Sequence, residues 1–445
     1  MRGRDTVITI AMIVLTLIAG CGETEPTATP VPPSATLVLH METSVPPTDT
    51  PGPTTTPVPP TVTPSPATPT ATATLIPATA TPSPPTDTVC AAGCDFTTIQ
   101  AAIDDASTAN GAIIEVTDPV HTEAGIVVDK DVTIRGLGIG NTIVQADDTP
   151  GEAPARVFLV EEGVTVTLKD MTIRHGRPSL QEECGGGIMN HGTLKLKNCV
   201  VSDNTANDGA GICNNGALTL INSTISGNTA DGIAPPGYEC GSGGGIKSVK
   251  GTLAVINSTV SGNQAEGKGG GIHISCACTA VFTNSTISSN QAVRSGGGVY
   301  IKGTLQLTHC TISNNAADDE GGGVCVRGRL DYANTIIANN SGGGNCVIGG
   351  EGGYKGMGTI GTNSNNLVGG SSCNPDYSGD PKLGPLANNG GDTKTHALLP
   401  GSPAIDAVSA INCTLATDQR GAPRPVERTS STTPCDIGAF ELQTE

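Results

Sequence analysis

The sequence contains no tryptophan, and its five tyrosines and four phenylalanines make up only 2% of the 445 residues. A globular core built on large aromatic side chains is therefore not expected, and few rings are present to stack on a ligand. Basic residues are also scarce: 23 lysines and arginines stand against 41 aspartates and glutamates, a formal charge of −18. Such a surface repels nucleic acid phosphates, so no nucleic acid partner is expected.

A long apolar run is missing as well. The longest candidate, Val7 to Ile18, has about 12 residues, fewer than the roughly 20 that a membrane-spanning helix needs. Two arginines precede the run, as in a signal peptide. Residues 18–21, Ile-Ala-Gly-Cys, resemble the bacterial lipobox, which implies that Cys21 is acylated and holds the protein at a membrane. We expect residues 1–21 to be a lipoprotein signal peptide. The mature protein would then be exported, lipid-anchored to the bacterial membrane and exposed on the cell surface or in the extracellular space.

Proline and glycine are abundant and unevenly placed. Residues 22–89 consist mainly of Thr, Pro, Ala and Ser, with too little apolar surface to drive collapse. This region is predicted to be a disordered Thr/Pro-rich stalk. From Cys90 the composition changes, and Phe96 to Ile103 predict a short amphipathic helix in which Thr97 and Gln100 have capping-box spacing. The helix would cap the next domain.

A repeat dominates the following region. A Gly-[Gly/Ala]-Gly-[Ile/Val] unit recurs at intervals of 24 to 34 residues, beginning at Gly185, Gly209, Gly243, Gly269, Gly296 and Gly321. Each unit is followed by a stretch of period-two alternation and by Asn-[Ser/Cys]-[Thr/Val]-[Ile/Val]-Ser-x-Asn or a near relative. One repeat cannot bury its own aliphatic residues, so neighbouring repeats must stack. We predict an all-β, single-stranded right-handed parallel β-helix solenoid over residues 90–345, its hand following from that of parallel crossovers.

The last Asn of each repeat should form a ladder at a bend, because Asn tolerates left-handed backbone geometry and its amide can bond the next rung. The ladder residues are Asn204, Asn228, Asn263, Asn290, Asn315 and Asn340. The Asn-Ser-Thr triplets at Asn222, Asn257 and Asn284 match the glycosylation sequon, but their identical place in each rung indicates a structural role.

The repeats from Gly185 to Asn340 resemble right-handed parallel β-helix proteins of the pectate-lyase-like superfamily and the short repeats of polymorphic outer membrane proteins. The stretch from Asn366 to Glu441, with its Asp-Gln-Arg-Gly and Asp-Ile-Gly-Ala-Phe-Glu motifs, is similar to the choice-of-anchor Q domain. That similarity implies an anchored surface protein without implying an activity. We expect residues 346–445 to form a Q-like region that closes the solenoid.

The number of cysteines indicates whether disulfides are expected. Without Cys21, 14 of the 15 cysteines remain, and in an exported chain this even number predicts a set of disulfides. Their connectivity cannot be read from the sequence.

The repeats carry candidate residues for two kinds of chemistry. Acidic residues precede the glycine units at Glu183, Asp208, Glu239, Glu266 and Glu320, and stacking could bring some within reach of a Ca²⁺ ion; a solvated acidic edge is the alternative. Pectate-lyase relatives combine Ca²⁺ with a basic residue. Basic or phenolic candidates expected to face outward are Lys247, His273, Tyr300 and Lys302, with Arg327 and Arg329 nearby. No single rung combines three carboxylates with such a base.

These observations leave three functions open. The first is a non-enzymatic, surface-displayed β-helix that binds extracellular polysaccharide, matrix or a partner protein. The second is a polysaccharide lyase acting on a uronate polymer by Ca²⁺-assisted β-elimination. The third is a structural rod of the cell envelope.

Overall fold

The computed structural model describes residues 85–179, 184–232, 240–349, 358–425 and 434–443, all within a compact unit that spans Ser83–Glu445. The predicted signal peptide, Cys21 and nearly all of the stalk lie outside the described residues. No helix among those described is both long and apolar enough to cross a membrane. The only α-helix described, α1 (Ile99–Asp104), is surrounded by strands, so the described chain is almost entirely β.

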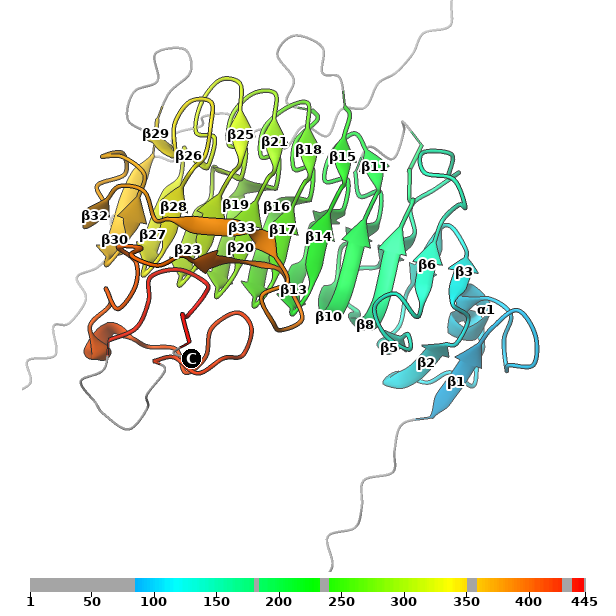
Figure 1. The fold of residues 1–445 in the computed structure, drawn as a ribbon. Helices are drawn as coiled ribbons and strands as arrows, with labels where there is room; N and C mark the ends of the chain where they lie inside the picture. The colour runs from blue at the N-terminus through cyan, green and yellow to red at the C-terminus, as the bar shows by residue number, and fades with distance from the viewer. Residues whose placement is uncertain (1–84, 180–183, 233–239, 350–357, 426–433, 444–445) are drawn as a thin grey trace, which may run out of the picture. The chain divides into compact units, whose positions relative to one another are not determined.

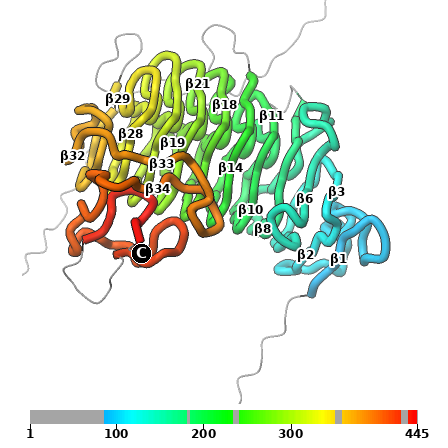
Figure 2. The backbone as a smooth tube through the Cα atoms, in the orientation of Figure 1, coloured from blue at the N-terminus to red at the C-terminus, as the bar shows by residue number. Residues whose placement is uncertain are grey.

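Parallel strands repeat in four stacks, and successive turns of the chain add neighbouring strands to each stack (Figures 1 and 2). The first stack follows the glycine units and contains β4 (Ile126–Val128), β7 (Phe158–Val160), β9 (Ile188–Asn190), β12 (Ile212–Asn214), the starts of β16 (Ile246–Ile256) and β19 (Ile272–Thr283), β22 (Val299–Ile301), β26 (Val324–Val326) and β29 (Cys346–Ile348). The second stack contains β1 (Thr86–Val89), β2 (Ala112–Val116), β5 (Val132–Arg135), β8 (Thr165–Arg174), β10 (Thr193–Ser202), β13 (Ala217–Ile221), the ends of β16 and β19, β23 (Thr304–Thr308), β27 (Arg329–Ala333) and β30 (Thr359–Ser364).

The third stack contains β3 (Val120–Thr122), β6 (Ile143–Gln145), the ends of β8 and β10, β14 (Thr224–Ser226), β17 (Thr259–Ser261), β20 (Thr286–Ser288), β24 (Thr311–Ser313), β28 (Ile336–Ala338), β31 (Leu367–Val368) and β32 (Tyr377–Ser378). The fourth is short: β11 (Thr205–Ala206), β15 (Thr229–Ala230), β18 (Gln264–Ala265), β21 (Gln291–Ala292) and β25 (Ala316–Ala317). This arrangement confirms the predicted parallel β-helix.

Columns of like aliphatic residues fill the interior. Ile246, Ile272 and Val299 stand in register in the first stack and are completely buried. Val260 and Ile287 continue the same pattern in the third stack. These positions belong to one continuous hydrophobic core, as expected when no rung can bury its own apolar face.

The glycine units are needed where neighbouring rungs approach closely. Gly269 has a φ of +70°, which residues with a Cβ rarely adopt. At Gly271 a Cβ would lie 2.6 Å from the carbonyl oxygen of Gly298 in the next rung. Glycine therefore recurs because both the turn and the rung spacing exclude a side chain.

The N-terminal helix is present where expected, but its cap differs by one residue. Thr98, rather than Thr97, is the N-cap, and its side chain accepts a hydrogen bond from the Ala101 amide at 3.1 Å. Glu123, from the loop after β3, accepts the amides of the first two helical residues, Ile99 and Gln100. A carboxylate remote in sequence thus satisfies two amides of the first turn, whereas Gln100 Oε1 accepts the Val127 amide.

The C-terminal region does not simply close the end of the solenoid. Strands β29, β30, β31 and β32 extend the stacks beyond residue 345. The chain then turns back as residues 383–425 and 434–443, here called the C-terminal arm, which contains the antiparallel pair β33 (Leu383–Ala387) and β34 (Thr395–Leu398) and the 3₁₀-helix η1 (Ala410–Asn412). The arm lies on the outer side of the third stack (Figure 1), where, for example, Thr259 Oγ1 donates to the Lys394 carbonyl at 2.6 Å.

Cysteine pairing is only partly as predicted. Four disulfides join described residues: Cys90–Cys94, Cys184–Cys213, Cys346–Cys373 and Cys413–Cys435. Such bonds persist in oxidising compartments, which agrees with an extracellular or surface protein. However, Cys199, Cys278 and Cys310 are thiols, so the predicted set of disulfides does not include every cysteine. Cys199 and Cys310 occupy the buried position that Ser223, Ser258 and Ser285 hold in other rungs, and no second cysteine is needed there.

Candidate functional site

The predicted asparagine residues stand in consecutive rungs and bond one another directly. Asn204, Asn228, Asn263 and Asn290 each donate Nδ2–H to Oδ1 of the next ladder residue at 2.9 Å. The series continues through Asn315 and Asn340, the last of which donates to Asn345 at 3.1 Å. Each Oδ1 also accepts the backbone amide of the preceding ladder residue, for example Asn228 N to Asn263 Oδ1 at 3.1 Å. These side chains are committed to the backbone and offer nothing to a ligand.

The predicted carboxylate column is not a shared metal site among the described residues. Asp208 is paired with Lys247 at 2.8 Å and accepts the Ser242 amide at 2.7 Å. Glu320 is paired with Arg327 at 3.1 Å. Glu266 is exposed, and Glu183 and Glu239 lie outside the described residues. In the described ranges no group of three or more His, Cys, Asp or Glu side chains is placed to hold a metal ion.

Three of the candidate bases form a column, and two of these, His273 and Tyr300, are buried and do not face solvent as expected, whereas Lys302 is partly exposed. Lys247, His273 and Tyr300 stand in register in β16, β19 and β22. His273 is 4% exposed and stacks on Tyr300, with ring centroids 5.2 Å apart and an interplanar angle of 8°. Lys268, itself buried, lies 5.0 Å over the Tyr300 ring centroid. The His273 and Tyr300 rings are therefore removed from solvent although they do not belong to the hydrophobic core of the solenoid.

The exposed outer side of the second stack carries a different surface. Four adjacent strands place uncharged side chains there, bordered in β16 by the exposed Lys250, and we call this set the neutral face: Ala217, Thr219, Ile221, Thr252, Ala254, Ile256, Thr279, Val281, Thr283, Thr304, Gln306 and Thr308. All twelve are exposed or partly exposed, and Val281 is 38% exposed. Strand spacing of about 4.8 Å makes this a regular array of hydroxyl and methyl groups. On a chain with a charge of −18, an uncharged face of four strands is distinctive.

A depression of about 410 Å³ adjoins the neutral face where β23 meets β27, with Thr304, Gln306, Thr308, Arg329 and Asp331 among its lining residues. Arg329 donates from Nε and Nη2 to the two Asp331 oxygens at 2.7 and 2.8 Å. These bonds lower the pKa of the Asp331 carboxyl, which therefore stays ionised. The depression presents a fixed carboxylate and guanidinium beside free hydroxyl groups. Sequence reasoning named Arg329 but not this site, although period-two alternation marked these residues as outward-facing.

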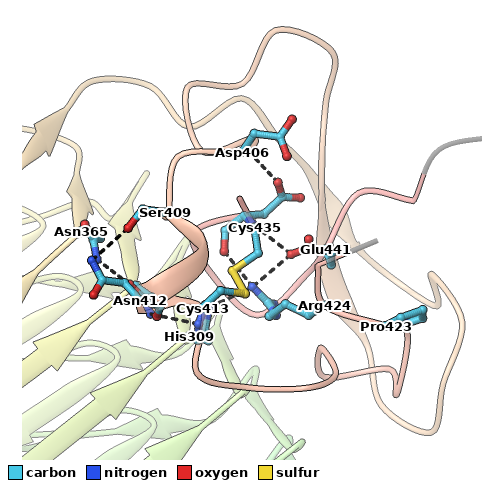
Figure 3. Close-up of a disulfide and its surroundings, with 12 residues drawn as sticks. His309, Asn365, Asp406, Ser409, Asn412, Cys413, Pro423, Arg424, Cys435 and Glu441 are labelled. Carbon is cyan, nitrogen blue, oxygen red and sulfur yellow. Dashed lines mark hydrogen bonds and ion pairs between the residues drawn. A yellow bond between two sulfur atoms is a disulfide. The ribbon is translucent and has the colours of Figure 1, made fainter. Parts of the chain in front are cut away.

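The motifs that resembled the choice-of-anchor Q domain form a buried charged network (Figure 3). Arg424 lies 2.8 Å from Nδ1 of His309 in the solenoid and donates to the backbone oxygens of Asp436 and Gly438. Its Nη1 atom is 3.2 Å from Glu441 Oε2, and both side chains are almost completely buried. The Cys413–Cys435 disulfide lies beside this network in Figure 3. These buried charges therefore attach the arm to the solenoid and do not face a ligand.

Comparison with known proteins adds the following. Residues 257–275 match the model of the Chlamydia polymorphic membrane protein repeat, in agreement with the repeat resemblance. No curated protein matches the sequence. Among solved structures, pectate lyase Pel9A is similar at 14% identity with a TM-score of 0.49, over 78% of this chain and 91% of that chain. The deglycosylated pectin methylesterase from Aspergillus niger is similar at 18% identity with a TM-score of 0.38, over 68% and 91%. The A-module of the mannuronan C-5 epimerase AlgE6 from Azotobacter vinelandii is similar at 15% identity with a TM-score of 0.31, over 61% and 81%.

Proposed function

We propose that this protein is a lipid-anchored, surface-displayed β-helix that binds a neutral extracellular polysaccharide along the neutral face, without turning it over. The observation that carries the proposal is the neutral face itself, four adjacent strands of exposed hydroxyl and small apolar groups with no charge among them. A linear polysaccharide offers alternating hydroxyl groups and C–H patches, which such an array can match by hydrogen bonding and apolar contact.

Electrostatics favours a neutral polymer over a polyanion. The chain carries −18, so a uronate or sulfated polymer would be repelled on approach. An uncharged polymer also avoids the cost of removing water from ions at a face that supplies no opposite charge. At the end of the face, Arg329 and Asp331 provide a donor pair and an acceptor that can fix the position of a sugar unit.

Ion pairing and burial of predicted bases support the proposal of binding without turnover. Lys247 and Arg327 are held in ion pairs with Asp208 and Glu320, and His273 is stacked against Tyr300 below the surface. A general base must reach the proton that it removes.

Two assays on the same preparation test the proposal. Affinity electrophoresis in gels containing β-glucan, galactomannan, arabinan or polygalacturonate should show retardation by at least one of the three neutral polymers and none by polygalacturonate. Incubation with polygalacturonate and Ca²⁺ should give no increase in unsaturated-product absorbance. Such an increase would establish the lyase, and no retardation by any polymer would favour the structural rod.

A further inference from the structure

The outer residues of the third stack repeat the same hydroxyl groups in rung after rung. Thr224, Thr259, Thr286 and Thr311 stand in one column, and Ser226, Ser261, Ser288 and Ser313 stand in the column beside it. The C-terminal arm bonds to the threonine column from the rung of Thr311 to that of Thr259, and it reaches the rung of Thr224 only through Asp392, which bonds to Asn222.

Where the arm covers the columns, it bonds to their hydroxyl groups. Thr286 Oγ1 donates to Gln419 Oε1 at 2.6 Å, and Ser288 Oγ is 2.9 Å from His396 Nε2. Thr311 Oγ1 accepts the Ala439 amide at 3.0 Å. The hydroxyl groups of the two columns therefore form hydrogen bonds to another segment of the same chain.

At the margin of the arm the same columns line an open cavity. Val200, Thr224, Ser226 and Ser261 form its solenoid side, and the arm residues Asn388 and Gly391 to Lys394 form its other side, enclosing about 350 Å³. Within the described part of the chain, the side-chain hydroxyl groups of Thr224, Ser226 and Ser261 have no hydrogen-bond partner. The hydroxyl groups that bind the arm in later rungs thus have counterparts at the cavity that bond to no other part of the described chain.

The arm side of the cavity is held in place. Asn222 Nδ2 donates to Asp392 Oδ2 at 2.9 Å, and Thr393 Oγ1 donates to the Asn257 carbonyl at 2.9 Å. Gln419 Nε2 donates to Thr393 Oγ1 at 2.9 Å from beneath. These bonds fix the segment that carries the exposed Asp392 carboxylate and Lys394 ammonium, so a ligand would meet a preformed wall.

We propose that this cavity is a second binding site, distinct from the neutral face, that takes a single hexose unit. Vicinal sugar hydroxyl groups both donate and accept, as the hydroxyl groups of Thr224, Ser226 and Ser261 require, and they can donate to the Asp392 carboxylate. Val200 and the Thr224 methyl group supply contact for the C–H face of the ring. A volume of about 350 Å³ is at the small end of ligand sites and suits one or two rings rather than an extended strand.

The test uses saturation-transfer NMR on the purified full chain with the methyl β-glycosides of glucose, galactose, mannose and N-acetylglucosamine. At least one glycoside should give a saturable signal in the wild type. The signal should weaken at least tenfold in Ser226→Phe, which fills the cavity, and also in the milder Asp392→Asn, which removes the acceptor charge. Gln291→Phe, at an exposed position of β21 in the fourth stack and outside both proposed sites, is the matched control and should keep the signal.

Two results would overturn the site: no saturable signal with any of the four glycosides, or a signal unchanged in both cavity variants. Displacement of the glycoside by a peptide of sequence Asp392 to Leu398 would also overturn it, because it would show that the cavity binds peptide. Retention of the wild-type thermal transition shows that Ser226→Phe folds, and Asp392→Asn decides if it does not. Failure here is separable from failure of the proposed function, because polymer retardation depends on the neutral face and should be unchanged in Ser226→Phe.

Discussion

Nη1 of Arg424 lies 2.8 Å from Nδ1 of His309, although 115 positions separate the two residues. Burial and the adjacent guanidinium lower the pKa of His309 well below its ordinary value, so the imidazole is neutral and Nδ1 accepts the hydrogen bond. His309 stands at the bend where other rungs have Asn222, Asn257 or Asn284, and like them it has a positive φ. At this departure from the asparagine of the neighbouring rungs the solenoid receives the buried guanidinium of the arm.

Replacing His309 by Asn tests that role, because Asn is the residue of the other rungs and retains the bend. We expect Arg424 to lose a buried partner and the arm to be destabilised by about 1–3 kcal/mol. Hydrogen exchange should become faster at residues 434–443 and stay unchanged in β12, β16 and β19. Uniformly faster exchange would show that His309 matters to the whole solenoid and not to the arm alone.

The buried network also predicts a pH dependence. It contains three carboxyl groups, Asp418, Asp436 and Glu441, but only two guanidinium groups, Arg420 and Arg424. Burial raises the pKa of Glu441 to about 8 in the folded protein, from an ordinary value of 4.5. The folded state thus binds a proton that the unfolded state releases, so this contribution to stability is complete below pH 4.5 and is lost as pH rises through about 8.

Glu441→Gln keeps the shape and removes the titration. Chemical denaturation between pH 5 and 9 should show a smaller fall in the free energy of unfolding for this variant than for the wild type. Gln443→Glu, at a neighbouring but more exposed position, is the control and should leave the slope unchanged. Parallel slopes for wild type and Glu441→Gln would rule out Glu441 as the titrating group.

The asparagine ladder should be a major source of stability. Asn263→Ala removes the acceptor for the Asn228 backbone and side-chain amides and leaves Asn290 Oδ1 without one of its donors. Because these groups are buried, we expect a loss of about 2–4 kcal/mol in the free energy of unfolding. The exposed neighbour Gln264→Ala serves as control, with an expected change within about 0.5 kcal/mol. Equal effects at the two positions would contradict a structural ladder.

Two thiols should be inert in the folded protein. Burial raises the pKa of both Cys199 and Cys310 to about 12, and neither side chain is accessible. Alkylation by iodoacetamide at pH 8, followed by peptide mass spectrometry, should leave both unmodified until denaturant is added. Modification of either under native conditions would mean that its rung opens readily or is packed differently.

Residues that recur in the repeats could be placed from the sequence, whereas contacts outside the repeats could not. Ile246, Ile272 and Val299 could be placed in one interior column because each recurs at the same point of a repeat. The burial of His273 could not, since an alternating strand shows which side a residue faces but not what covers that side. The bond between Asn222 and Asp392 joins positions 170 residues apart, and no repeat relates them.

The repeats do contain indications of some features that were not predicted. Cys199 and Cys310 were counted toward disulfides, yet they occupy the Ser position of the Asn-Ser-Thr motif, which indicated a small buried side chain with a polar atom. His309 begins a near relative of the motif, but its partner Arg424 lies in a region without repeats. Register within the solenoid follows from local pattern, whereas attachment of the arm depends on contacts between remote segments.

The most direct test of the central claim compares two valines of similar exposure. Val281, 38% exposed, lies within the neutral face, and Val293, 41% exposed, follows β21 of the fourth stack. Affinity electrophoresis with the neutral polysaccharide that retards the wild type should show at least tenfold weaker binding for Val281→Asp. Binding of the polymer would remove bound water from the new carboxylate, and the face supplies no opposite charge to compensate for that cost. Val293→Asp should bind like the wild type. Equal binding by both variants, or equal loss in both, would contradict recognition by the neutral face.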